Sequence, residues 1–178
     1  VIQRVKELFV QYDIKPYDKT THQGNIKHVL TKKGYHSEEF MLCFITYQKT
    51  IKHIDQIVET LVQEFPHIKT IIQNINERHD NVILGDEEKI LYGQGYIYDT
   101  LLKNQYKISL KSFYQINPIQ VEVLYQTAID LAHLNQDSVV LDAYCGIGTI
   151  TLSLAKHVKK VYGVEVVYQA IEDAKNNA

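Results

Sequence analysis

Arginine is scarce in this chain of 178 residues, where only Arg4 and Arg78 occur. The formal net charge is −2 at pH 7, so the chain as a whole has no electrostatic attraction for phosphate. Binding to nucleic acid would therefore require a local lysine patch or a segment outside this sequence. The composition is 45% hydrophobic and 22% charged, which supplies enough apolar material for a sizeable core.

Cysteine is equally sparse, since Cys43 and Cys145 are far apart and form no C-x-x-C pair. This excludes a disulfide framework and is typical of a reduced, cytoplasmic protein. The eight histidines are dispersed, and neither His22 nor His28 has a third ligand at a metal-binding spacing, so we expect no metal site. No run approaches the roughly 18 apolar residues of a membrane span, and the N-terminus lacks a signal-peptide pattern.

Residues 1–113 are expected to form an α+β domain in which an antiparallel sheet packs against a helix. Ile51, Ile54, Val58 and Leu61 repeat at helical spacing, with Thr50 as a candidate N-cap. Short apolar runs separated by turn residues predict strands. We expect them at 26–31, 40–47, 68–75, 96–102 and 106–113, with a hairpin formed by 82–84 and 89–92.

The pattern changes after a boundary near residues 110–117, so that 114–178 form a second predicted domain. Asn117-Pro118 places an N-cap before a proline at the first helical position. The helix is expected to continue to about His133. Strand, helix, strand and helix then alternate, which indicates the start of a parallel α/β domain of Rossmann-like type. The apolar face of the first helix is expected to contain Ile119, Val123, Ala128, Leu131 and Ala132.

The segment from Asp142 to Thr149 has the features of a cofactor-binding loop. Gly146 and Gly148 permit backbone conformations that are closed to other residues and allow a ligand to approach the chain closely. A helix predicted to start near Thr149 would present unpaired N–H groups. Glu165 follows the next strand, where a carboxylate can accept both ribose hydroxyls of an adenosine.

Three interpretations of this loop compete. A dinucleotide fingerprint requires a third glycine, but the corresponding position is Thr151. A plain strand-to-helix turn would need glycine for geometry alone, and would not account for Asp142 before the loop and Glu165 after it. S-adenosylmethionine fits best, because it has no pyrophosphate but still requires a close loop and an acid for its ribose.

The chain resembles the RNA uracil-C5 methyltransferases, particularly the bacterial 23S rRNA 5-methyluridine enzymes. The resemblance covers nearly the whole chain, and its last two motifs are quite specific. It rests on Asn25-Ile-Lys-His-Val29, on Ile72-Gln-Asn-Ile-Asn76 with Asn81-Val-Ile-Leu-Gly85, on Ser112-Phe-Tyr-Gln-Ile-Asn-Pro118, and on Val140-Leu-Asp-Ala-Tyr-Cys-Gly-Ile-Gly-Thr149.

The resemblance implies S-adenosylmethionine as the cofactor, RNA as the partner and a set of site residues. Gln115 would contact the methionine part of the cofactor, and Glu165 would hold its ribose. Tyr144, Gly146, Gly148 and Thr149 would line the cofactor. In this family a cysteine adds to C6 of uracil and C5 then attacks the methyl group. The family's nucleophile and general base lie in later motifs, so we expect no catalytic residue in this chain.

Cys145 is the residue most easily mistaken for that nucleophile. It lies beside Gly146 ahead of a predicted helix, a setting in which the pKa of a thiol can fall. No histidine is near it in sequence, and the resemblance places the nucleophile elsewhere. We therefore interpret Cys145 as a packing residue of the loop, and Cys43 as a buried small hydrophobe within an apolar strand.

Other functions stay open. A tRNA uracil-5-methyltransferase of the same family is one alternative, and a methyltransferase acting on a small molecule is another. A third is a non-catalytic RNA-binding module whose surface contains Lys32, Lys33, Tyr92, Tyr96 and Tyr98.

The chain is expected to be an internal segment of a longer protein, because it lacks an initiator methionine and only 13 residues follow Glu165. Two parallel strands cannot bury both faces of an α/β sheet, and they leave unpaired edges. We therefore expect the segment 138–178 to self-associate or to be disordered.

Overall fold

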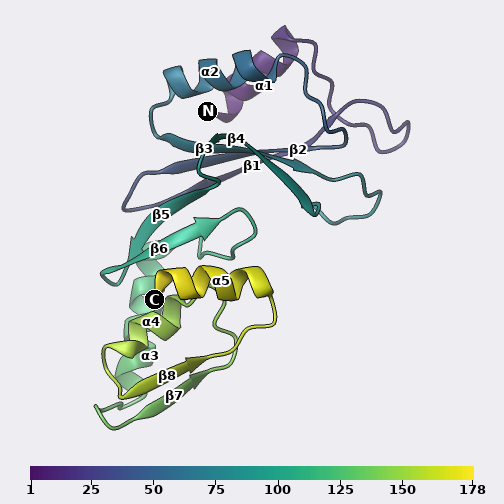
Figure 1. Cartoon of the computed structure of the whole chain (residues 1–178). Helices are drawn as coiled ribbons and strands as arrows, with labels where there is room; N and C mark the ends of the chain where they lie inside the picture. Colours follow the sequence, from purple (N-terminus) through teal and green to yellow (C-terminus); the bar gives the residue numbers. More distant parts are fainter. The chain divides into compact units, whose positions relative to one another are not determined.

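The computed structural model describes all 178 residues, and contacts divide them into two compact units (Figure 1). The first unit contains residues Val1–Lys33 and Glu38–Ile97. The second contains Gly34–Ser37 and Tyr98–Ala178. This division falls within a strand, earlier than the boundary at 113 and 114 that the sequence suggested. The domain boundary between residues 113 and 114 stays a prediction.

The first unit is a four-stranded mixed sheet with two helices. The strand order is β1-β2-β3-β4, with β2 and β3 parallel and the outer pairs antiparallel. The predicted α+β class is confirmed, but the sheet is not antiparallel throughout, because α2 returns the chain to the starting end of the sheet before β3. The elements are α1 (Ile2–Gln11), β1 (Ile26–Lys33), β2 (Phe40–Thr46), α2 (Ile54–Glu64), β3 (Ile68–Ile75) and β4 (Glu87–Gly93).

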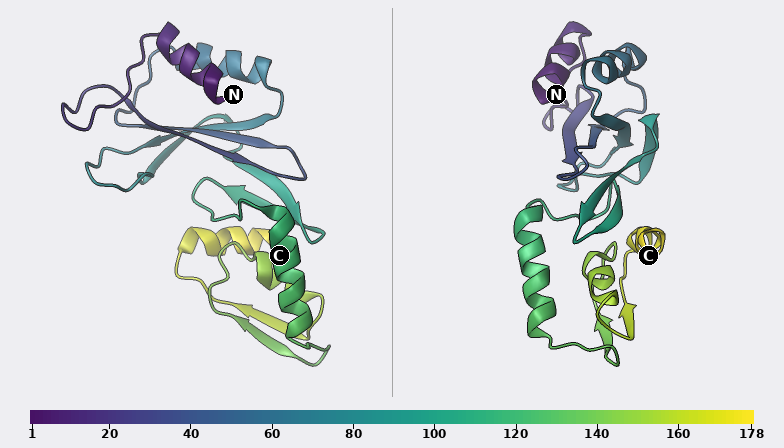
Figure 2. Two further views of the ribbon diagram at one scale, coloured as in Figure 1. Left: turned by 180° about the vertical axis from the view of Figure 1, so that it is seen from behind. Right: turned by 90° about the vertical axis from the view of Figure 1, so that its left-hand side faces the viewer.

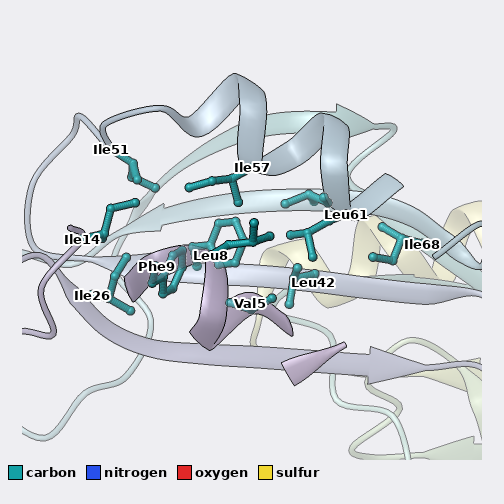
Figure 3. Packing of buried hydrophobic residues seen from close by; sticks show 12 residues of the cluster. Val5, Leu8, Phe9, Ile14, Ile26, Leu42, Ile51, Ile57, Leu61 and Ile68 are labelled. Atoms are coloured by element: carbon teal, nitrogen blue, oxygen red, sulfur yellow. The ribbon is translucent and has the colours of Figure 1, made fainter. Parts of the chain in front are cut away.

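Helices α1 and α2 cover the same face of this sheet (Figure 2). The sequence did not predict α1, which begins without a side-chain cap and so lacks the usual start signal. Val5, Leu8 and Phe9 nevertheless repeat at helical spacing and are buried. They meet Leu42 and other strand residues in the core of the unit (Figure 3). Helix α2 begins at Ile54 after His53, rather than after the predicted cap Thr50.

The predicted hairpin of 82–84 with 89–92 is wrong, since no strand covers residues 82–84 and β4 pairs with β3 instead. Buried asparagine side chains hold this loop. Asn76 Nδ2 donates to the carbonyl oxygens of Val82 at 2.7 Å and Ile83 at 2.8 Å. Asn74 and Gly85 exchange two further hydrogen bonds. These amides satisfy the backbone that a second strand would otherwise have paired.

The second unit has the alternating order expected of the start of an α/β methyltransferase domain. Strands β7 and β8 form a parallel pair, seen side by side in Figure 1, and β5 pairs with β6. No helix of the structure is both long and apolar enough to cross a membrane. The elements are β5 (Tyr96–Leu101, in this unit from Tyr98), β6 (Asn104–Ser109), α3 (Pro118–Leu131), β7 (Val139–Asp142), α4 (Thr149–Ala155), β8 (Lys160–Gly163) and α5 (Tyr168–Asn177).

Helix α3 begins as predicted, because the Asn117 side chain accepts a hydrogen bond from Gln120 N at 3.3 Å. Its buried face was predicted wrongly. Val121, Tyr125 and Ile129 are buried, whereas the predicted residues Ile119, Val123 and Leu131 are exposed. Both stripes are apolar, so the periodicity alone could not choose between them. A hydrogen bond from α3 to α4, between the Tyr125 and Thr149 hydroxyls at 3.0 Å, is part of what orients the helix.

Candidate cofactor site

The loop between β7 and α4 is held against the end of β8. Cys145 N donates to Val164 O at 3.0 Å, and Val164 N donates to Asp142 O at 2.8 Å. Asp142 also accepts the Thr151 hydroxyl at 2.5 Å. The loop and the residues that follow β8 therefore form one hydrogen-bonded assembly at the carboxyl ends of two parallel strands. Ligands of open α/β sheets bind at this end.

The two loop glycines have left-handed backbones, with φ of +53° at Gly146 and +85° at Gly148. Both values favour glycine, and Gly148 is the N-cap of α4. A Cβ built on Gly146 would meet no other atom within 4 Å. Gly146 is thus required by conformation rather than by crowding, and open space lies beside it where a ligand could approach.

Glu165 is fixed by backbone hydrogen bonds. Its Oε1 accepts from Val166 N at 2.8 Å and Val167 N at 2.9 Å, and its Oε2 accepts from Gly146 N at 3.1 Å. Hydrogen bonds from Val167, Val166 and Gly146 lower the pKa of this carboxyl below its ordinary value. A carboxylate oxygen has two acceptor positions, so Oε2 retains one for an incoming hydroxyl.

Gln115 lies in the irregular segment 112–115, ahead of α3. Its side chain is half-buried and makes no hydrogen bond within the chain. Two buried carboxylates hold its neighbours instead. Ser112 Oγ donates to Asp173 Oδ2 at 2.6 Å, and the Tyr114 hydroxyl donates to Asp99 Oδ2 at 3.2 Å.

Asp99 also accepts hydrogen bonds from a turn of the same unit. Its carboxylate accepts the backbone N–H groups of Tyr35, His36 and Ser37 at 2.9 to 3.1 Å. Burial, followed by the charge and hydrogen bond of Asp99, raises the pKa of Tyr114 well above its usual range, so its hydroxyl remains a donor. Asp99 thereby links a turn near residue 36 to the segment that presents Gln115.

The other predicted loop residues differ in exposure. Tyr144 is 90% exposed, so its ring is available to a ligand. Thr149 points its hydroxyl at Tyr125, and its carbonyl accepts the Tyr106 hydroxyl at 3.0 Å. The structure places all six predicted residues in the second unit, and their roles toward a cofactor stay predictions: Gln115, Tyr144, Gly146, Gly148, Thr149 and Glu165.

Cys145 is a packing residue, as the sequence suggested. It is only 6% exposed, and a Cβ on Gly163 would lie 3.0 Å from its Sγ. Burial, then the charges of Asp142 and Glu165, raises the pKa of its thiol. Cys43 is fully buried, and burial raises the pKa of its thiol to about 12. Neither thiol is therefore activated as a nucleophile.

The structure adds Asp99 and Asp173, which sequence reasoning missed. Both are 1% exposed. Ser112 and Asp173 are 61 positions apart, and no local spacing pairs them. The sequence offers a single signal for Asp99 and Asp173, which is that an acidic residue occurs within a segment that forms a packed strand or helix.

The five residues suggested as an RNA-binding surface are not brought together. Lys32 and Tyr92 lie on β1 and β4, the two opposite edges of the sheet. Three strand spacings separate these edges, which is on the order of 14 Å. Lys33 pairs with Glu38 at 3.3 Å.

A family model described as tRNA (uracil-5-)-methyltransferase matches residues 37–178. The chain belongs to this family. The family was predicted from the sequence motifs, and its match confirms that prediction. Membership of a methyltransferase family likewise confirms the expectation of S-adenosylmethionine as the cofactor.

Curated relatives agree with the family. All 178 residues match uncharacterized RNA methyltransferases of Oceanobacillus iheyensis at 44% identity, Streptococcus mutans at 47% and Streptococcus agalactiae at 48%. The chain covers 39%, 40% and 40% of those proteins, respectively. It thus spans about two fifths of the length of the curated relatives it matches.

Solved structures share the fold. The crystal structure of Pyrococcus abyssi tRNA (uracil-54, C5)-methyltransferase in complex with S-adenosyl-L-homocysteine matches with a TM-score of 0.81 and 25% identity. The match covers 99% of this chain and 42% of that one. The M. jannaschii tRNA m1G37 methyltransferase matches with a TM-score of 0.50 at 15% identity, over 98% of this chain and 47% of its own, and shows the fold alone.

Proposed function

We propose that this chain supplies the S-adenosylmethionine-binding part of an RNA uracil-5-methyltransferase. The observation that carries the proposal is the Glu165 carboxylate, held 3.1 Å from Gly146 N at the carboxyl end of a parallel strand. An ionised acid beside a close-approach loop suits the ribose of an adenosine cofactor. When bound, the cofactor supplies an electrophilic methyl group.

The residues of this chain bind and orient that cofactor. Glu165 accepts a ribose hydroxyl on the free position of Oε2. For Oε2 to accept the second ribose hydroxyl as well, the hydrogen bond from Gly146 N–H to Oε2 would have to break. Gln115, whose amide has no partner within the chain, contacts the methionine part. Tyr144 and the loop from Gly146 to Thr149 form the wall between these two ends.

The substrate is a uridine of RNA, and 23S rRNA is the substrate that the sequence motifs favour. A tRNA uridine is the competing substrate, because the Pyrococcus abyssi structure is that of a tRNA (uracil-54, C5)-methyltransferase. The resemblance places the nucleophile that adds to uracil in a later motif in either case, and neither Cys43 nor Cys145 suits that role, because both are buried.

Calorimetric titration with S-adenosylhomocysteine tests the cofactor site. We expect the wild-type chain to bind and Glu165→Ala to lose binding. Glu172→Ala is the matched control, because that glutamate is half-buried on α5 and pairs only with Lys175. Absence of binding by the wild-type chain would overturn the proposal that these residues form the cofactor site.

The substrate requires a second experiment. The protein for this experiment contains this chain and is as long as the curated relatives. It would be incubated with labelled S-adenosylmethionine and either 23S rRNA or tRNA. Nucleoside mass spectrometry is expected to find 5-methyluridine in the 23S rRNA. Label in tRNA alone would assign the competing substrate, and another methylated nucleoside would refute the uracil-5 assignment.

A further inference from the structure

Four rings of the first unit form a closed cluster on its surface, which we call the four-ring cluster: Tyr17, His22, Tyr47 and His79. The Tyr17 and Tyr47 ring centroids are 4.8 Å apart, and those of His22 and His79 are 4.3 Å apart. Tyr17 also neighbours His22 at 6.0 Å, and Tyr47 neighbours His79 at 5.8 Å. Each ring thus contacts two others, although the four residues come from three separate segments of the chain.

The loop that carries Tyr17 and His22 is pre-formed. Asp18 Oδ1 accepts the N–H groups of Thr20 at 2.7 Å and Thr21 at 3.0 Å, and Asp18 O accepts His22 N at 2.8 Å. His22 has a φ of +56°, a conformation that costs energy for a residue with a side chain. A Cβ on Gly24 would lie 1.9 Å from Pro16 O, so the loop depends on glycine there. The hydrogen bonds of this loop place the His22 ring beside that of His79.

The cluster is not part of the hydrophobic core. His22 and His79 are exposed, and Tyr17 and Tyr47 are half-buried. Tyr17 Oη lies 2.7 Å from His22 Nδ1 and 3.1 Å from His79 Nδ1. Each imidazole therefore uses Nδ1 internally and leaves Nε2 without a partner in the chain. Lys27 Nζ and the Tyr47 ring centroid lie 5.1 and 4.8 Å from the Tyr17 ring centroid. The ring surface open to solvent is therefore greatest at the exposed imidazoles of His22 and His79, which also carry a free donor or acceptor.

The surroundings are locally positive in a chain whose net charge is −2. Lys19, Lys27 and Arg78 border the cluster, against the two carboxylates of Asp18 and Asp80. Asp80 pairs with Arg78 at 2.5 Å, and Lys27 Nζ donates to Asn76 O and Arg78 O. Lys19 is exposed and is therefore the cation available to an outside anion.

The size of the adjoining hollow excludes an enclosed ligand. Its volume is about 20 Å³, which is room for about one water molecule. Small-molecule sites are usually several hundred Å³ in volume. A partner must therefore lie across the rings rather than enter a pocket, and flat groups with a nearby negative charge suit such a surface.

We propose that the four-ring cluster binds single-stranded RNA by stacking an unpaired base on its rings, with Lys19 beside the neighbouring phosphate. Base stacking on aromatic side chains combined with a lysine contact to the backbone is the usual chemistry of sequence-tolerant RNA binding. The free Nε2 atoms of His22 and His79 add hydrogen bonds to base edges or phosphate oxygens. This inference rests on the proposed RNA function, but it assigns a surface that the cofactor site does not use.

Fluorescence anisotropy of the full chain with a labelled 12-nucleotide single-stranded RNA tests the proposal. The double variant His22→Asn, His79→Asn removes both rings, while asparagine tolerates the left-handed backbone at position 22. We expect it to weaken binding about 5- to 150-fold, the range for loss of one stacked base. Lys19→Gln, at an exposed position, is expected to weaken binding and to lower the salt slope by about one.

His53→Asn is the matched control, because it removes an exposed imidazole from another left-handed backbone position of the same unit. It is expected to leave the affinity within about twofold, as surface changes away from a contact usually do. Equal affinity of the wild-type and double variant, or no binding by the wild-type chain, would overturn the proposal. Titration of the same proteins with S-adenosylhomocysteine reports separately on the cofactor site, so the failure of one proposal is distinguishable from the failure of the other.

Discussion

The Ser112 hydroxyl lies 2.6 Å from Asp173 Oδ2, joining the segment before α3 to helix α5. Ser109 Oγ donates to the same oxygen at 2.7 Å, and Asp173 Oδ1 is buried without a partner. Further along α5, Asn177 Oδ1 accepts Lys107 N, and its Nδ2 donates to Ile147 O in the cofactor loop. One helix thereby connects the loop to the segment that presents Gln115.

Ser112→Ala is expected to lower the free energy of unfolding by about 1–3 kcal/mol, because it removes one of two donors from a buried carboxylate. It is also expected to increase amide exchange in residues 109–116 and to weaken S-adenosylhomocysteine binding. Denaturant titration and exchange measurements check these effects. Thr127→Ala, an exposed hydroxyl on α3, is the control. Equal exchange in both variants would count against the role of Ser112 in positioning the segment.

The pH dependence of cofactor binding follows from Glu165. Its pKa is lowered by backbone hydrogen bonds, so the carboxylate remains ionised to a lower pH than an ordinary glutamate and protonates only as the pH falls through this lowered pKa. We therefore expect the affinity for S-adenosylhomocysteine to be flat from about pH 8 to about pH 5. Calorimetry across this range checks the expectation. Glu165→Gln, which cannot titrate, should bind weakly at every pH, and a wild-type decline above pH 5 would disprove this account.

Gly163→Ala is expected to destabilise the fold by about 1–3 kcal/mol through overpacking. The added Cβ would lie 3.0 Å from Cys145 Sγ and 3.1 Å from Cys145 Cβ. In a Cys145→Ala background the sulfur is absent, so the same change should cost less. Urea titration of the four proteins in this cycle measures the coupling. Gly146→Ala is expected to destabilise the fold through the backbone φ of +53° alone, because no atom lies within 4 Å of the added Cβ. The loss of stability that it causes should therefore not become smaller in the Cys145→Ala background.

Self-association is expected from strand β7. Val139 is 61% exposed and Leu141 is 64% exposed, and the β7–β8 sheet has only two strands. Leu141→Thr keeps a strand-forming residue but reduces the apolar surface, so it should shift the chain toward monomer in light scattering. Val10→Thr, at a 74%-exposed position on α1, is the control. A wild-type chain that remains monomeric, with slow amide exchange in 138–178, would contradict this expectation.

Local patterns were sufficient for much of the second unit. The Asn117 cap, the parallel β7 and β8 strands and the Gly146–Gly148 turn depend on interactions within a few residues or on a single strand-helix-strand repeat. The first unit was harder to predict. The strand direction between β2 and β3 depends on a crossover, and the loop after Asn76 depends on side-chain bonds across the sheet.

The sequence by itself determined the family, the cofactor class and the acid that follows β8, because their signals are local and specific in residue type. Only the tertiary structure decided which face of α3 is buried, since two apolar stripes on one helix are equivalent until a partner packs on one of them. It also decided which residues hold the segment of Gln115, and that the rings of the four-ring cluster, which come from three separate segments of the sequence, lie together. Those relationships join Asp173 to Ser112 and His79 to Tyr17 across about 60 residues of chain, a distance at which no spacing rule applies.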